Sequence, residues 1–133
     1  MVRWRLGRRD EPSADSVSSS CAQGARIYAL LNISYLGLGG PAYEVSNPRY
    51  CDLELFDRAI ADNLDLVRGM KVRIGTTTVG SNGIEPLRLA RQAADRGQLS
   101  LMVHVADAPP GISEVLPHLR PRDIITHCFT GRP

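Results

Sequence analysis

Four short apolar segments alternate with segments of helical pattern, and this alternation constrains the fold most strongly. The apolar segments span residues 25–34, 70–75, 99–106 and 123–129. Between the first two, a repeat with spacings of three and four predicts an amphipathic helix; it consists of Leu53, Phe56, Ile60, Leu64 and Val67. Further helices are expected over 84–96 and over a short stretch after Ser113. The order β-α-β-α-β-α-β predicts an α/β fold, with a parallel sheet that is apolar on both faces and covered by helices.

Glycines and polar residues predict where these elements end. Gly69 is expected to stop the first helix, Gly97 to form the C-terminal cap of the second, and Ser113 to cap the short third helix. Residues 76–83 are expected to form a loop. No G-x-G-x-x-G or P-loop lysine follows any strand, so nucleotide binding has little support. A compact flavodoxin-like sheet of four strands satisfies the pattern as well.

Composition excludes several classes of protein. Among 133 residues, 43% are hydrophobic and 23% charged, which is the balance of a globular chain rather than a disordered one. No apolar run is long enough to predict a membrane-spanning helix. The net charge of +2 is too small to indicate binding to nucleic acid or to an anionic membrane.

The cysteines and the N-terminal residues bear on location. Cys21, Cys51 and Cys128 are odd in number and widely spaced, which argues against a disulfide framework or a zinc knuckle. Residues 1–24 are rich in Arg and Ser, without an apolar period, and are expected to form a disordered extension. Their acidic residues count against an organellar transit peptide. A cytoplasmic protein is therefore expected.

Three side chains are candidates for chemistry because of their positions. His104 and His127 lie near the C-terminal ends of the third and fourth predicted strands, where parallel α/β folds collect functional groups. Adjacent strands are about 4.8 Å apart, so two imidazoles there could share a metal ion. A strand histidine is also commonly a hydrogen-bonded core residue. His118, in the short helix, is expected to be a surface residue.

Lys71 is the only lysine among 16 basic residues, and it falls within a strand expected to be buried. Unlike arginine, a lysine can lose its proton, form a Schiff base or react with CO₂ to give a carbamate. The plain alternative is a side chain that extends to solvent from the end of a strand.

The segments GMKVRIGTTTVGSNGIEPLRLA, LMVHVADAPP and LRPRDIITHCFTGRP together resemble the amidohydrolase superfamily, and more narrowly its deacetylase-type, dihydroorotase-related metallohydrolases. The resemblance covers residues 25–133 and implies part of a TIM (β/α)₈ barrel, apparently its third to sixth strands. It implies a binuclear site, usually of zinc, in which carboxylated Lys71 bridges the metals and His104 and His127 bind the second one. The implied reaction is hydrolysis of an acetylated amide or ester by hydroxide that the metals generate.

The chain departs from that family in what it lacks. There is no His-x-His pair, no histidine before His104, and no aspartate from a later strand. A complete barrel needs about 250 residues. One hypothesis is therefore a fragment of a metal-dependent hydrolase; the other is an inactive product or an interaction module that self-associates through open barrel edges. A Schiff-base lyase that uses Lys71 is a third, weaker interpretation.

Overall fold

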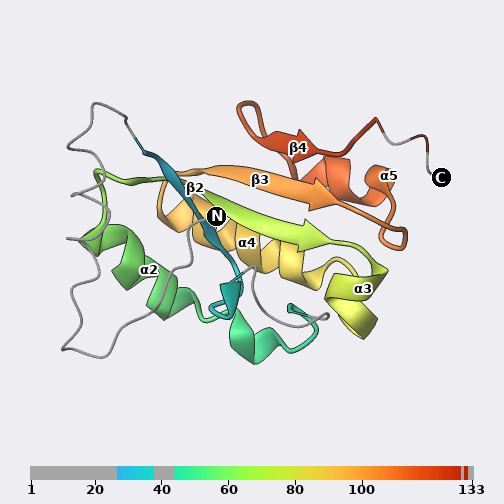
Figure 1. Ribbon diagram of the computed structural model, residues 1–133, viewed down its shortest axis with the longest axis horizontal. Coiled ribbons are helices and arrows are strands. Elements are labelled where there is room, and N and C mark those ends of the chain that lie inside the picture. Colours follow the sequence, from blue (N-terminus) through green and yellow to red (C-terminus); the bar gives the residue numbers. More distant parts are fainter. Residues whose placement is uncertain (1–26, 38–43, 130, 132–133) are drawn as a thin grey trace.

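A computed structural model describes residues 27–37, 44–129 and 131. The predicted N-terminal extension, residues 1–24, lies outside the described residues. Four parallel strands form one sheet: β1 (Ala29–Asn32), β2 (Val67–Ile74), β3 (Ser100–Val105) and β4 (Ile124–Thr126). The strands lie side by side in chain order, β1-β2-β3-β4 (Figure 1).

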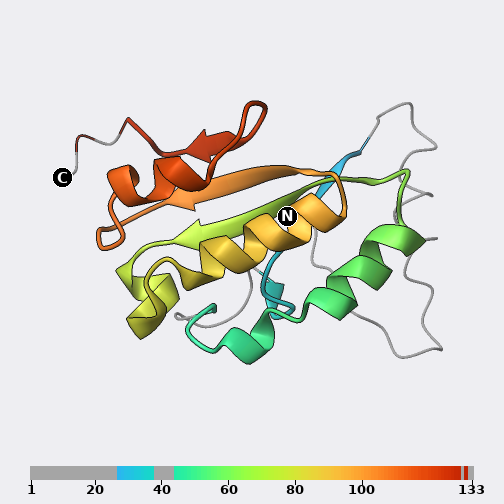
Figure 2. The same cartoon turned by 180° about the vertical axis from the view of Figure 1, so that it is seen from behind.

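The helices gather on one side of this sheet. Helix α4 (Glu85–Arg96) covers β2 and β3, α2 (Leu53–Asp62) packs against α4, and α5 (Ile112–Val115) leads into the 3₁₀ turn η5 (Leu116–His118), which also contacts α4 (Figure 2). Strands in chain order with helices on one face are the arrangement of a (β/α)₈ barrel. A flavodoxin-like sheet has a different strand order and helices on both faces. The predicted α/β fold is confirmed, and the flavodoxin-like alternative is not.

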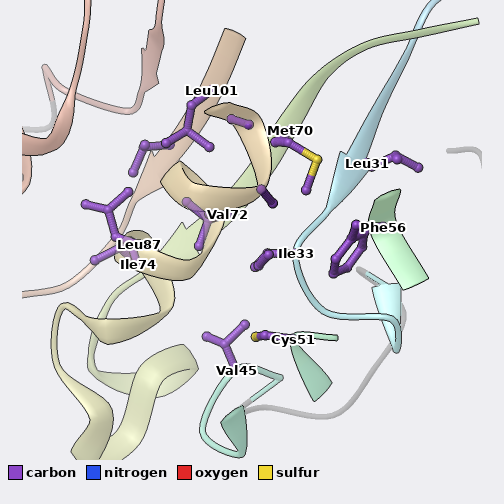
Figure 3. Close-up of a cluster of buried hydrophobic side chains, with 14 of the residues drawn as sticks. Leu31, Ile33, Val45, Cys51, Phe56, Met70, Val72, Ile74, Leu87 and Leu101 are labelled. Carbon is purple, nitrogen blue, oxygen red and sulfur yellow. The ribbon is translucent and has the colours of Figure 1, made fainter. Parts of the chain in front are cut away.

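The hydrophobic core lies between the sheet and these helices (Figure 3). Alternate residues of the two central strands point into it, and five of them are fully buried: Met70, Val72, Ile74, Leu101 and Val103. Helix α4 supplies Leu87 and three buried alanines, whose small side chains let it approach the strands closely. Among the described residues, no helix has the length and apolar character needed to cross a membrane.

The first predicted helix is too long. Helix α2 starts at Leu53 because the Asp52 side chain accepts hydrogen bonds from the first free backbone N–H groups, and it ends at Asp62. Asn63 leaves the helical conformation while its side-chain amide donates to the Ala59 carbonyl at 2.9 Å. Leu64 is consequently 68% exposed, and Val67 already belongs to β2.

Gly69 does not stop a helix, contrary to expectation; it lies within β2. A β-carbon at this position would come within 2.7 Å of Leu30 Cδ2 and 2.8 Å of the Ser100 carbonyl oxygen. The glycine therefore allows β1 and β3 to approach β2 closely on both sides.

The remaining boundaries agree in part with expectation. Helix α4 matches the predicted 84–96, and Gly97 is its C-cap. The expected loop 76–83 instead contains α3 (Thr76–Val79) and the 3₁₀ turn η4 (Gly80–Asn82). The N-cap of α5 is Gly111 rather than Ser113, and its N–H donates to the Glu114 carboxylate at 2.9 Å. Strand β4 spans only three of the seven residues predicted, and η3 (Pro48–Tyr50) precedes α2.

Candidate metal site

The face of the sheet opposite the helices is polar, although the sequence predicts strands that are apolar on both faces. Residues paired in neighbouring parallel strands project to the same face. On the polar face, Asn32 pairs with Lys71, and Arg73 pairs with His104, which in turn pairs with Thr126. All five are half-buried. The open face thus concentrates polar side chains toward the C-terminal ends of the strands.

The two predicted histidines meet there. His104 comes from β3, and His127 directly follows β4, where its φ of 64° turns the backbone out of the strand. Their ring centroids are 4.6 Å apart and the rings are inclined at 71°, an edge-to-face contact. The structure therefore brings these two imidazoles together, while the role of the pair as metal ligands stays a prediction.

The surroundings of His104 favour its neutral form. Burial lowers the pKa of His104, and the nearby His127, Arg73 and Lys71 lower it further. The Nδ1 atom of His104 is buried and has no hydrogen-bond partner among the described residues. A neutral imidazole with a free ring nitrogen is the form that binds a metal ion.

Lys71 lies on the same face as the histidines, two residues before Arg73, the residue that pairs with His104. It is half-buried rather than buried as the sequence predicts. The polar face explains the difference, because Lys71 points away from the helices that cover Met70 and Val72. His118 is apart from this set, in η5 on the side of α4.

Glu44 and Arg73 form an ion pair on this face that the sequence does not predict. The Glu44 side chain is 1% exposed, and its Oε2 accepts from Arg73 Nη1 at 3.4 Å. Burial raises the pKa of Glu44, while the positive charges of Arg73 and Lys71 oppose this rise. Glu44 follows a Gly-rich stretch far from Arg73 in sequence, so no local pattern indicates the pair.

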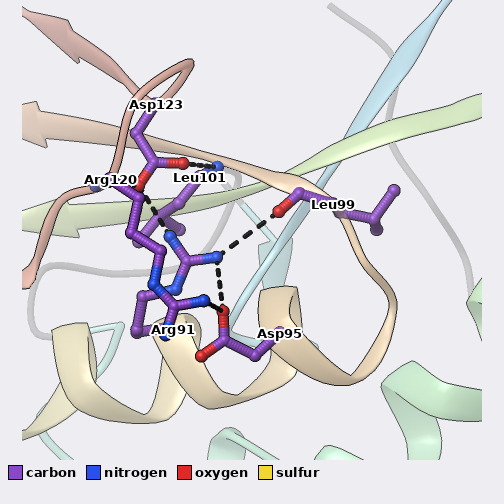
Figure 4. A network of polar contacts seen from close by, with 6 residues as sticks. All are labelled: Arg91, Asp95, Leu99, Leu101, Arg120 and Asp123. Carbon is purple, nitrogen blue, oxygen red and sulfur yellow. Dashed lines mark hydrogen bonds and ion pairs between the residues drawn. The ribbon is translucent and has the colours of Figure 1, made fainter.

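Asp123 is a further residue without a recognisable sequence signal. Its carboxylate accepts from the backbone N–H of Leu101 at 2.7 Å and of Arg120 at 2.8 Å. It also forms an ion pair with Arg91 Nη1 at 2.6 Å (Figure 4). The network joins the start of β4 to β3 and α4, at the opposite end of β4 from His127.

Standard ligands alone do not complete a metal site here. Within the part of the chain that the structure describes, no three His, Cys, Asp or Glu side chains converge so that they could hold a metal ion. Among the described residues, Lys71 is the candidate for a further donor that shares the face of His104 and His127.

The comparisons with known proteins bear on these residues. The chain is 37% identical over 107 residues to a deacetylase from Enterococcus faecalis and 35% identical over 109 residues to one from Agrobacterium fabrum. It also resembles the solved structures of a dihydroorotase (35% identity, TM-score 0.73) and an adenine deaminase (36% identity, TM-score 0.75), which cover 78% and 86% of the chain.

These likenesses point to the amidohydrolase superfamily. No protein-family profile matches the chain. The two deacetylase alignments each cover 80% of this chain but only 29% and 27% of the relatives, and the two solved structures are covered to 28% and 32%. The predicted superfamily is confirmed over this partial match. The four parallel strands correspond to part of the TIM barrel of these amidohydrolases.

Proposed function

We propose that this protein is a metal-dependent hydrolase that cleaves an acetylated amide or ester, with Lys71, His104 and His127 as metal ligands. The observation that carries the proposal is the contact between the two imidazoles, at 4.6 Å, on the sheet face that also holds Lys71. The deacetylase names of its relatives support the substrate class. We propose zinc because imidazole ligands suit it.

The residues present fit such a group. His104 offers a buried ring nitrogen without a hydrogen-bond partner among the described residues, and burial lowers its pKa, which favours the neutral imidazole. A lysine ammonium has no lone pair to donate. Lys71 must therefore release two protons, one to free the Nζ lone pair and one after Nζ has bonded to CO₂, which converts the ammonium cation into an anionic carbamate oxygen donor. The resulting set of two imidazoles and an anionic oxygen suits a divalent cation.

The two histidines, Lys71 and Arg73 would have different roles in this site. His104 and His127 would hold a metal ion through their imidazoles, and the carbamate of Lys71 would supply the anionic oxygen ligand. When bound, the metal would polarise the substrate carbonyl and lower the pKa of bound water. Arg73, held by the buried carboxylate of Glu44, keeps a positive charge beside Lys71 and would favour its carboxylated, anionic form.

Carboxylation of Lys71 can be tested directly, because Lys71 is the only lysine in the chain. In the presence of ¹³C-bicarbonate and Zn²⁺, a carbamate carbon should appear in the ¹³C spectrum of the wild-type chain. The Lys71 signal should be absent from Lys71→Arg, which keeps the positive charge but does not form this carbamate, whereas a signal from the N-terminal amine should remain. The N-terminal amine is a second possible source, and it is unchanged in Lys71→Arg. An identical carbamate signal in both proteins would contradict the role of Lys71.

Histidine variants test the metal ligands. His104→Gln and His127→Gln should each weaken Zn²⁺ binding at least tenfold in isothermal titration calorimetry, whereas the control His118→Gln should bind as the wild type does. Hydrolysis of N-acetyl and O-acetyl compounds should follow the same order. The proposal fails if the wild type binds no Zn²⁺, or if His118→Gln is as impaired as His104→Gln.

Self-association is a second candidate function, favoured by apolar side chains at the β4 edge. Ile124 is 45% exposed and Phe129 98% exposed. An open strand edge with such residues is a surface on which another chain can add. Light scattering should then show an oligomer that Phe129→Ser shifts toward the monomer, and a wild type that is monomeric at high concentration would exclude it.

Borohydride trapping with a carbonyl compound tests the Schiff-base alternative.

A further inference from the structure

Strand β4 is weakly held by apolar packing, although it carries His127 at its end. Ile124 is 45% exposed, and Ile125 and Thr126 are only half-buried. The strand pairs with β3 through three residues only. Burial of apolar surface therefore does little to fix its position along β3.

The buried group at this strand is instead the carboxylate of Asp123, whose side chain is 4% exposed. Its Oδ1 accepts from the Leu101 N–H in β3, and its Oδ2 accepts from Arg91 in α4 and from the Arg120 N–H. Arg91 is itself 12% exposed and also pairs with Asp95 at 2.9 Å (Figure 4). One carboxylate thus ties the start of β4 to both its neighbouring strand and the helix behind it.

The register of β4 decides whether the histidines meet. The side-chain period of a strand is two, so a slip of one residue along β3 moves every β4 side chain to the opposite face. Such a slip would displace His127 from His104. Because the hydrogen bond from Leu101 to Asp123 fixes this register at the start of β4, it also fixes the position of the imidazole at the other end.

We propose that Asp123 and Arg91 are positioning residues that hold His127 against His104. The proposal deepens the proposed function, because its Zn²⁺-binding measurement rests on His127 being a metal ligand. The contact between the two rings can be observed without metal. Neither residue touches the histidine pair; both act through the backbone of β4.

The test uses the proton spectrum of the three histidines, which is simple enough to assign with single His→Gln variants. In metal-free wild type, the ring protons of His104 and His127 should show a mutual nuclear Overhauser effect. Asp123→Asn, which keeps the shape but removes the charge, should abolish it and raise the Zn²⁺ dissociation constant about 10–100-fold. Arg91→Lys, which keeps a cation beside Asp123, should retain the effect and most of the affinity.

Asp57→Asn is the matched control, because Asp57 of α2 forms an exposed ion pair at 2.9 Å with Arg96 of α4, the helix that also carries Arg91. It should leave both readouts at the wild-type values. The proposal is overturned if Asp123→Asn keeps the ring contact, if Asp57→Asn loses it equally, or if Asp123→Asn simply unfolds the whole chain. A wild type that shows the ring contact but binds no Zn²⁺ would contradict the proposed function. The nuclear Overhauser effect between the two rings would still decide the positioning role.

Discussion

Replacement of Gly69 by alanine should destabilise the chain, although propensity alone predicts the opposite. Within a strand, glycine is about 0.5–1 kcal/mol less favourable than alanine, so the sequence predicts a gain. In the structure, the added methyl group would lie 2.7 Å from Leu30 Cδ2 and 2.8 Å from the Ser100 carbonyl oxygen. Leu30 can change rotamer, but the Ser100 oxygen belongs to the backbone of β3 and moves only with the strand.

Overpacking of this kind costs about 1–3 kcal/mol, and the backbone contact favours the upper end. After subtraction of the propensity gain, the free energy of unfolding should fall by about 2 kcal/mol. With a urea m-value of about 2 kcal/mol/M, the midpoint of urea denaturation should fall by about 1 M, as followed by circular dichroism.

Gly111→Ala provides the control for Gly69→Ala. Its β-carbon would make only ordinary contacts, at 3.9 Å to Glu114 Oε1 and Ser113 Oγ, so the midpoint should change less. Adding Leu30→Ala to Gly69→Ala should not restore stability, since the clash with Ser100 remains. A Gly69→Ala chain at least as stable as the wild type would refute the reasoning.

Three further predictions concern the core, a thiol and a buried carboxyl. Leu101→Ala should lower the free energy of unfolding by about 2–5 kcal/mol in urea denaturation, whereas Leu64→Ala, at an exposed position, should change it by about 0.5 kcal/mol or less. Burial, with a contribution from the Glu44 charge, raises the pKa of Cys51 to about 11. At pH 8, iodoacetamide should therefore modify Cys128 in the folded chain, whereas Cys51 should react only after denaturation. Peptide mass spectrometry can show which cysteine is modified. Burial raises the pKa of Glu44 in the folded state, so the unfolded chain releases this proton at lower pH. The free energy of unfolding should therefore fall as the pH rises through the folded-state pKa. Glu44→Gln should flatten that decline in urea titrations measured between pH 4 and 8.

The parts of the fold predictable from sequence are those set by local pattern. The buried strands and α4 follow from apolar runs and from a regular helical repeat that ends at Gly97. The end of α2 was not predictable in the same way, because Leu64 and Val67 continue the helical period by coincidence. The role of Gly69 was not predictable either, because it depends on contacts with two neighbouring strands that are distant in sequence.

The candidate site divides along the same line. His104 and His127 could be placed together, since both lie at the C-terminal ends of successive parallel strands. The charged partners could not be predicted. Glu44 reaches Arg73 across the sheet face, and Asp123 reaches Arg91 from another element, so each pairing exists only in the folded chain.

The chain-order arrangement of the strands also has a consequence for folding kinetics. Each strand pairs only with the strands next to it in sequence, so every pairing closes one helical connection and no pairing must wait for a distant segment. Each step then carries the loop-closure entropy of one connection only, which favours stepwise growth of the sheet outward from β2, α4 and β3. We expect β4, with its three paired residues, to join last and to exchange its amide hydrogens first.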